Sequence, residues 1–194
     1  MLITLYGINN IGKSTQAKRL VERLKAEGFE AVYVKYPVYD LEPSGPQLNR
    51  ILRGAEGQAV SDHELQMWFA LNRFQFEPHL KEWLLDEQIV VAEDYTGTGL
   101  AWGAVKGLDL EWLEQINAPL IKEDIALLMD GERFKESSEA GHRHESDEDS
   151  MQRARQTHLA LAAKYDWKIV SAKGTLEEVE ARLWDQIRLH LPQK

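Results

Sequence analysis

The first fifteen residues, MLITLYGINNIGKST, carry the strongest structural signal in the chain. Residues 2–6 form an apolar run with the length of a buried strand. The run is followed at once by Gly7-Ile8-Asn9-Asn10-Ile11-Gly12-Lys13-Ser14, which matches the pattern G-x-x-x-x-G-K-S. In this pattern a glycine-rich loop joins a strand to a helix, and its backbone N–H groups surround a phosphate. The sequence therefore predicts a phosphate-binding loop (P-loop) between the first strand and the first helix.

The residue types of this loop indicate a nucleoside triphosphate bound with Mg²⁺. Lys13 is expected to reach the β and γ phosphates, and Ser14 is expected to bind Mg²⁺ through its hydroxyl. A guanine-specific switch protein would also need an Asn-Lys pair to read its base, and the chain has no such pair. The residues expected to contact the nucleoside triphosphate, which the family resemblance described below implies is ATP, are Gly7, Asn9, Asn10, Ile11, Gly12, Lys13, Ser14 and Thr15.

Apolar runs alternate with amphipathic stretches along the rest of the chain. Further buried strands are predicted at residues 31–34, 88–92, 125–129 and 167–170. Such alternation is typical of a parallel sheet covered by helices on both faces. We therefore predict an α/β fold, a P-loop three-layer α/β/α sandwich with a five-stranded parallel sheet flanked by helices.

Several helix ends are marked by their residue types. Gly28 is expected to end the first helix, predicted over residues 13–27. Ser61 with Glu64, and Thr175 with Glu178, match the capping box, in which two side chains satisfy backbone N–H groups at a helix start. These residues are expected to be structural.

Residues 131–149 differ from the rest of the chain, because apolar periodicity stops there and charged residues crowd together. A long irregular segment in a compact domain is commonly a functional lid. A length of 194 residues suits one domain. We predict a single P-loop domain over residues 1–194 with an inserted lid at about residues 131–149.

The composition argues against several classes of protein. The formal net charge is −9, so the chain lacks the basic surface that would bind nucleic acid or an anionic membrane, and any phosphate needs a local cationic pocket. The absence of cysteine excludes disulfides and thiolate metal sites and fits a reducing compartment. No apolar run is long enough to span a membrane, and no signal peptide is evident. We expect a cytoplasmic protein.

Four further motifs follow the P-loop along the chain. They are Tyr36-Pro37, Phe69-Ala70-Leu71-Asn72-Arg73, Glu93-Asp94-Tyr95 and Arg153-Ala154-Arg155. In order and spacing, the set resembles thymidylate kinases over nearly the whole chain. The resemblance implies transfer of the ATP γ-phosphoryl group to dTMP, with Mg²⁺, by a cytoplasmic homodimer.

Phe69 and Arg73 lie four residues apart, so they project from one face of a helix toward a common ligand. In the family that the chain resembles, the matching pair stacks on thymine and hydrogen-bonds its edge. The resemblance also places Trp102 beside the sugar and Asn9 near its 3′-OH. The substrate-binding residues that it implies are Tyr36, Pro37, Phe69, Arg73, Asp94, Thr98 and Trp102.

Glu93 ends an apolar strand, where P-loop enzymes place a carboxylate that works with Mg²⁺. Ser14 and Glu93 are therefore the expected metal-binding residues. The resemblance also implies a catalytic arginine, which the P-loop of this chain does not contain. We expect it in the lid, with Arg143 as first choice before Arg133 and Lys135. The expected catalytic residues are Lys13, Glu93 and Arg143.

The motifs expected to contact the phosphate acceptor differ in charge from those of the family. The family triplet Asp-Arg-Tyr is Glu93-Asp94-Tyr95 here, and Val38, Tyr39 and Asp40 stand where the family often has a second arginine. Two arginines that would hold the acceptor phosphate are therefore replaced. Charge-assisted hydrogen bonds contribute roughly 1.5–3 kcal/mol each, so the replacement has consequences for binding.

Two explanations of this departure stay open. Either the nearby cations Lys35, Arg50 and Arg53 compensate for the replaced arginines, or the acceptor carries no phosphate. In the second case the protein is a deoxynucleoside kinase, and Glu93, Asp94 or Asp40 is the general base that a hydroxyl acceptor needs. A catalytically degenerate nucleotide-binding protein is a further alternative.

Overall fold

The computed structural model of the protein describes residues 1–54, 58–132 and 148–192. Within them the chain forms one five-stranded sheet in the order β2-β3-β1-β4-β5, and every neighbouring pair is parallel. The strands are β1 (Leu2–Tyr6), β2 (Ala31–Lys35), β3 (Ile89–Glu93), β4 (Ile125–Asp130) and β5 (Lys168–Ser171). The predicted α/β fold with a five-stranded parallel sheet is confirmed.

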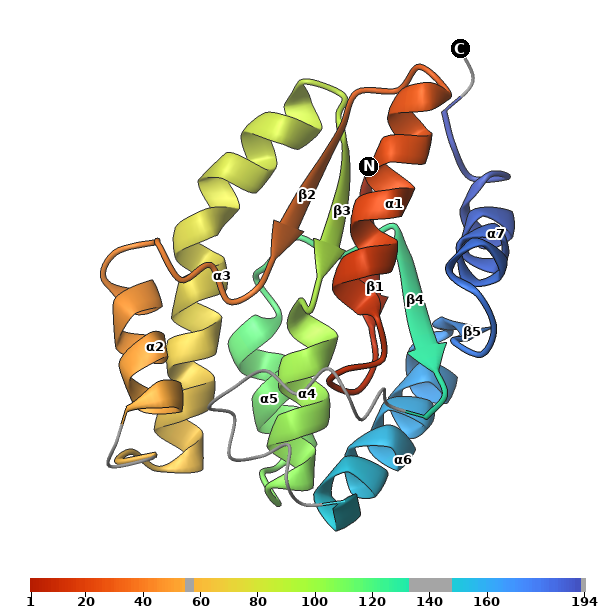
Figure 1. Cartoon of the computed structure of the whole chain (residues 1–194). Helices are drawn as coiled ribbons and strands as arrows, with labels where there is room; N and C mark the ends of the chain where they lie inside the picture. The colour runs from red at the N-terminus through yellow and green to blue at the C-terminus, as the bar shows by residue number, and fades with distance from the viewer. Residues whose placement is uncertain (55–57, 133–147, 193–194) are drawn as a thin grey trace.

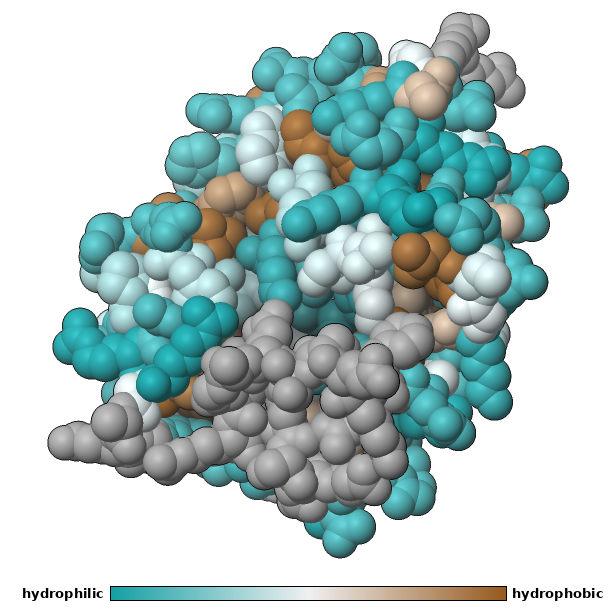
Figure 2. Space-filling model, viewed as in Figure 1, coloured by the Kyte–Doolittle hydropathy of each residue, from teal (hydrophilic) through white to brown (hydrophobic). Residues whose placement is uncertain are grey.

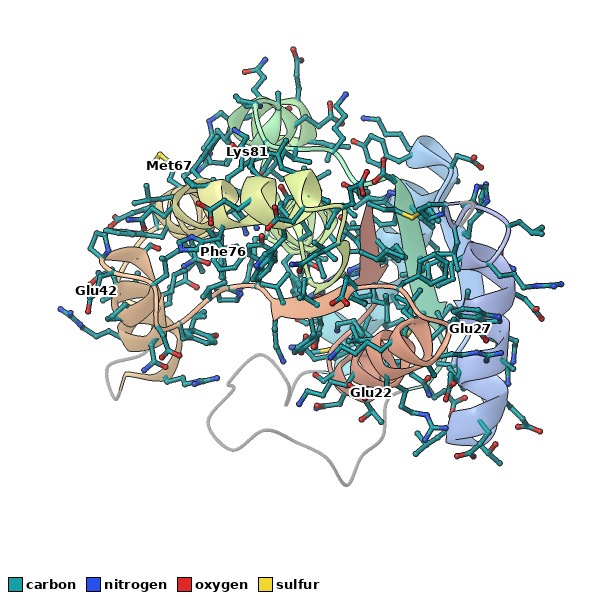
Figure 3. The ribbon with its side chains drawn as sticks, turned by 90° about the horizontal axis from the view of Figure 1, so that it is seen from above. Glu22, Glu27, Glu42, Met67, Phe76 and Lys81 are labelled. Carbon is teal, nitrogen blue, oxygen red and sulfur yellow. The ribbon has the colours of Figure 1, made fainter. Side chains whose placement is uncertain are left out.

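Helices cover both faces of this sheet (Figures 1 and 3). α1 and α7 lie on one face, α3, α4 and α5 lie on the other, and α6 packs beside α4. α2 packs against α3 at the outer side of the molecule. The bounds are α1 (Lys13–Ala26), α2 (Ser44–Arg53), α3 (Asp62–Leu85), α4 (Thr96–Val105), α5 (Leu110–Asn117), α6 (Glu148–Tyr165) and α7 (Leu176–Ile187).

The central strand β1 separates two hydrophobic cores because successive strand residues point to opposite faces. Ile3 and Leu5 pack in the cluster that contains residues of α1 and α7. Leu2 and Tyr6 pack in the cluster that contains residues of α3, α4 and α5. The sheet is therefore buried on both faces, which is why its strands read as continuous apolar runs rather than as alternating ones.

The register of the sheet places Glu93 beside the P-loop. In the parallel pairing of β1 with β3, Leu5 lies opposite Glu93, and the loop that follows β1 begins two residues later. After β3 the chain crosses to the other side of β1. β2 and β3 lie on one side of β1, and β4 and β5 lie on the other. Ligands in open parallel sheets bind at the carboxyl ends of the strands where the strand order reverses.

The two predicted capping boxes differ in the structure. At Thr175 both reciprocal hydrogen bonds with Glu178 are present. At Ser61 the hydroxyl accepts from the backbone N–H of Glu64, but the Glu64 carboxylate accepts from Trp68 Nε1 one turn further along α3. A nearby indole donor therefore replaces the backbone donor as the partner of this side chain.

Within the described ranges, no helix has both the length and the apolar character needed to cross a bilayer. On the face seen in Figure 2 hydrophilic residues predominate, and hydrophobic ones form small separate areas. This distribution agrees with the share of charged residues in the chain, which is 28%.

A buried histidine makes the folded state sensitive to mild acid. The Nδ1 atom of His158 lies 2.7 Å from the Ala154 carbonyl oxygen, and Nε2 has no hydrogen-bond partner among the described residues. Burial lowers the pKa of His158 from 6.5 to about 4. The unfolded chain therefore takes up this proton first as the pH falls, so folding stability that is present near pH 7 is lost as the pH falls from about 6.5 toward about 4.

We expect the free energy of unfolding to drop by about 2 kcal/mol between pH 7 and pH 5 through His158 alone. Replacing His158 with glutamine should remove this part of the pH dependence, whatever its effect at pH 7. His190→Gln, at an exposed position, is the matched control and should keep the wild-type slope. Urea unfolding at several pH values measures the difference. Equal slopes for wild type and His158→Gln would contradict the assignment.

Candidate active site

The P-loop has the backbone conformation that its glycines allow. Gly7 has φ 144°, and a Cβ atom there would lie 2.7 Å from the carbonyl oxygen of Met129 on β4. Gly12 has φ 94° at the N-cap of α1. Side chains at these two positions would be strained or would clash, so the loop stays close to the sheet and to the amino end of α1. Backbone N–H groups there are available to an anion.

Lys13 is buried and its ammonium group lies across this loop. Its Nζ donates hydrogen bonds to the carbonyl oxygens of Gly7 at 2.9 Å and Ile8 at 3.0 Å. The same Nζ lies 3.6 Å from Asp94 Oδ1, which follows β3. The cation is therefore held at the carboxyl edge of the sheet by oxygens that a bound phosphate can replace.

Glu93 is the centre of a polar cluster at the end of β3. Ser14 Oγ donates to its Oε1 at 2.7 Å, the Tyr33 hydroxyl donates to its Oε2, and Lys35 Nζ lies 3.2 Å from Oε1. Burial opposes ionisation, but the charges of Lys35 and Lys13 and the bonds from Tyr33 and Ser14 outweigh it and lower the pKa of Glu93. Glu93 is therefore a carboxylate at neutral pH.

The pair formed by Ser14 and Glu93 fits Mg²⁺. This ion prefers hard oxygen ligands, and proteins commonly hold it with one or two side chains plus water and substrate phosphates. A hydroxyl and a carboxylate oxygen meet here beside the P-loop. In the part of the chain that the structure describes, no cluster of three or more acidic or imidazole side chains forms a metal cage. The arrangement suits a metal that arrives with a nucleotide.

Asp94 occupies the position after Glu93 with φ 57°, a left-handed conformation that aspartate tolerates better than most residues. Its backbone N–H donates to the Leu5 carbonyl, and its Oδ1 accepts from Thr98 Oγ1 at 2.8 Å. Burial raises the pKa of Asp94, although Lys13 acts in the opposite direction. The carboxyl group is therefore directed toward α4 and the P-loop lysine.

One cavity of about 730 Å³ extends from the P-loop to α3. All seven residues that were expected to bind substrate line it, as do six of the eight expected at ATP. The other two, Gly7 and Ile11, do not, since Gly7 approaches β4 and the Ile11 side chain is buried in the core. Arg143, Arg133 and Lys135 lie outside the described residues.

Arg73 reaches this cavity from the interior of the protein. Its Nε donates to Asn117 Oδ1 at 3.1 Å and its Nη1 to the Tyr95 carbonyl at 3.4 Å. Burial lowers the pKa of Arg73 to about 10, so the guanidinium is still a cation at neutral pH. Phe69, one turn earlier on α3, lines the same cavity. A flat ring and a fixed planar cation thus border one space.

Two cations from the acceptor side also line the cavity. Lys35 lies at the end of β2, and the Arg53 guanidinium stacks 4.6 Å from the ring centre of Tyr39. Arg50, the third candidate, is exposed and does not line it. Of the three nearby cations, the fold therefore brings two to this space.

Sequence reasoning missed Gln66 and Tyr33, which both belong to this region. Gln66 precedes Phe69 by three residues and Arg73 by seven, so helical periodicity was the signal that could have found it. Tyr33 was treated as part of an apolar strand, and only the side-by-side pairing of β2 with β3 brings its hydroxyl to Glu93.

The comparison with known proteins decides the family. The sequence profile described as "Thymidylate kinase" matches residues 5–183, from β1 into α7. The chain belongs to the thymidylate kinase family. It is 30% identical to human thymidylate kinase, over 92% of this chain and 85% of the human one. It is 31% identical to a probable thymidylate kinase of Thermococcus kodakarensis, over 94% of this chain and 95% of that one.

The fold agrees with this membership. The structure of thymidylate kinase from Candida albicans superimposes with a TM-score of 0.83, covering 97% of this chain and 91% of that one. The two sequences are 23% identical, so this likeness concerns the fold. The family motifs of this chain therefore lie on a backbone with the same architecture as that of the Candida albicans enzyme.

Proposed function

We propose that this member of the thymidylate kinase family transfers the γ-phosphoryl group of ATP to dTMP and produces dTDP. The observation that supports it most directly is the cavity that joins the P-loop to Phe69 and Arg73 on α3. One end offers backbone N–H groups and Lys13 to phosphates, and the other offers a ring and a cation to a base. Family membership supplies the reaction type.

In this proposal catalysis is achieved by positioning and charge neutralisation, since phosphoryl transfer between phosphates needs little covalent chemistry from the protein. Lys13 neutralises the β and γ phosphates, and Ser14 and Glu93 hold Mg²⁺. Bound Mg²⁺ supplies further positive charge to the transferred group. Arg143 remains the predicted catalytic arginine of the lid in a single kinase domain; of the predicted lid segment, residues 131–149, the last two residues belong to α6 and residues 133–147 lie outside the described residues.

We assign the acceptor phosphate to Lys35 and Arg53. Both line the cavity together with Tyr39 and Asp94, from the two segments in which the family arginines are replaced. The Arg53 guanidinium stacks on the Tyr39 ring and donates to Asn49 Oδ1 at 3.2 Å, and a planar guanidinium matches the oxygens of a phosphate. Relocated cations explain how a dianionic acceptor is tolerated near Asp94.

A coupled assay of ADP release with ATP and Mg²⁺ tests the proposed reaction. Acceptors to compare are dTMP, dCMP, dGMP and free thymidine. We expect turnover with dTMP to exceed that with every other acceptor. Turnover with thymidine but not dTMP would replace the proposal with a nucleoside kinase, and no turnover with any acceptor would contradict it.

We further propose a cytoplasmic homodimer that pairs through α3. Met67, Leu71 and Phe74 form an apolar stripe on this helix, and they are 51%, 39% and 36% exposed. Figure 3 shows Met67 directed away from the body of the molecule. Their i, i+4, i+7 spacing places them on a different face from Gln66, Phe69 and Arg73. A second copy of the chain is the occupant that we assign to this stripe.

Replacing Leu71 with glutamate should convert the protein to a monomer. A carboxylate at the centre of the stripe would have to be desolvated in the dimer interface. Light scattering coupled to size-exclusion chromatography measures the mass. Leu85→Glu, at an exposed leucine outside the stripe, is the matched control and should leave the dimer intact. A monomeric wild type, or a dimeric Leu71→Glu, would contradict the assignment.

A further inference from the structure

Two buried polar atoms without partners meet at one end of the active-site cavity. They are Gln66 Oε1 and Arg73 Nη2, neither of which has a hydrogen-bond partner among the described residues. Both side chains are 4% exposed and line the cavity. A buried polar group without a partner destabilises a protein, so such a pair at a ligand cavity indicates atoms that the ligand satisfies.

The absence of a side chain at Gly99 keeps this end of the cavity open. A Cβ atom at Gly99 would lie 3.0 Å from Arg73 Nη2 and 3.3 Å from Gln66 Oε1. Both unpartnered atoms therefore border the same small space at the start of α4. Phe69 lies between Gln66 and Arg73 in the sequence of α3 and lines the same cavity, so a flat ligand stacked on its ring presents its edge to both atoms.

The two atoms differ in hydrogen-bonding character. Gln66 Oε1 accepts, whereas Arg73 Nη2 donates. The complementary ligand edge carries an N–H donor next to a carbonyl oxygen. Thymine and uracil have this pattern at N3–H and O4, whereas cytosine has the reverse, an acceptor at N3 beside an amino group. If the Gln66 amide turned to donate to N3 of cytosine, the amino group would still face the Arg73 guanidinium, which can only donate.

We propose that Gln66 is a specificity-determining residue that accepts the N3–H of a 4-oxopyrimidine nucleotide while Arg73 Nη2 donates to O4. This inference rests on the proposed function and deepens it, because it names the atom that selects thymine-type over cytosine-type acceptors. The Nε and Nη1 atoms of Arg73 donate to Asn117 and Tyr95, which fixes the guanidinium and leaves Nη2 as its nitrogen without a partner among the described residues.

Binding measurements test the inference separately from turnover. Isothermal titration calorimetry compares dTMP, dCMP and N3-methyl-dTMP, which lacks the N3–H donor. Wild type should bind dTMP about 10- to 100-fold more tightly than either of the other two. In Gln66→Met, which keeps the side-chain length but loses the acceptor, the preference of dTMP over N3-methyl-dTMP should fall to about threefold or less.

Gln75→Met is the matched control, because Gln75 lies on the same helix and its Oε1 also has no hydrogen-bond partner in the described part of the chain, but it does not line the cavity. It should keep the wild-type preferences. Gln66→Asn withdraws the amide by one methylene and serves as a second variant, with the same loss expected. Thermal unfolding establishes that each variant is folded.

Equal binding of dTMP and N3-methyl-dTMP by wild type, or a preference that survives in both Gln66 variants, would overturn the inference. So would a wild type that does not bind dTMP. A wild type with the predicted binding pattern but no ADP release would support the base-reading role of Gln66 while contradicting the proposed reaction. The two failures are therefore distinguishable.

Discussion

Replacing Lys13 with alanine is expected to lower kcat by at least about 10³-fold, because transition-state charge on the transferred phosphoryl loses a cation fixed inside the protein. The structure shows Lys13 buried, bound to the Gly7 and Ile8 carbonyls and 3.6 Å from Asp94. Residues 7–15 contain no other lysine or arginine. The coupled ADP assay at saturating ATP and dTMP measures the loss.

The control for this variant is Lys25→Ala, on the same helix and half exposed. It should leave kcat within about twofold of wild type, since surface substitutions rarely change a fixed site. Thermal unfolding should show that Lys13→Ala is folded, so that the loss reports chemistry. A kcat for Lys13→Ala within tenfold of wild type would contradict the role assigned to this residue.

The second large effect is expected from Glu93→Gln. The substitution keeps the shape of the side chain but removes the charge that Ser14, Tyr33 and Lys35 surround. If Glu93 and Ser14 hold Mg²⁺, apparent Mg²⁺ affinity should fall by about 10- to 100-fold and kcat by roughly 10²-fold at ordinary Mg²⁺ concentrations. Titrating Mg²⁺ in the coupled assay separates the two effects.

Glu22→Gln is the control for the charge change, because Glu22 lies on the exposed side of α1 (Figure 3). Its Mg²⁺ dependence should equal that of wild type. Tyr33→Phe removes only one hydrogen bond to Glu93 and should weaken Mg²⁺ binding by less than the charge change does. An unaltered Mg²⁺ dependence in Glu93→Gln would exclude Glu93 as a metal-binding residue.

Most of the fold could be predicted because its signals are local. Each strand is an apolar run bounded by polar or small residues, and four of the five predicted strands were displaced from the observed ones by no more than one residue at either end. The fifth, residues 2–6, matches β1 at both ends. The capping box predicted at Ser61 forms only in part, because Trp68 competes for the Glu64 carboxylate, and the spacing of Ser61 and Glu64 does not reveal this competitor.

The part of the candidate site that lies in one continuous segment could be predicted from the sequence, whereas the part assembled from separate segments could not. The P-loop is one continuous segment, and its backbone conformation follows from Gly7 and Gly12. The cluster around Glu93 is different, because β2 must lie beside β3 before Tyr33 and Lys35 can reach the carboxylate. That Arg53 lines the cavity and Arg50 does not likewise depends on how α2 packs against α3.

The sequence alone established a P-loop kinase fold and a family resemblance, because glycine conformations, apolar runs and motif spacing are properties of short segments. Side-chain partners belong to the folded chain. Asp94 lies against Lys13, and the unpartnered atoms of Gln66 and Arg73 border one space, because segments far apart in sequence meet at the carboxyl edge of the sheet. Hydrogen bonding and burial act over a few ångströms, so these relations exist only once the strands are paired and the helices packed.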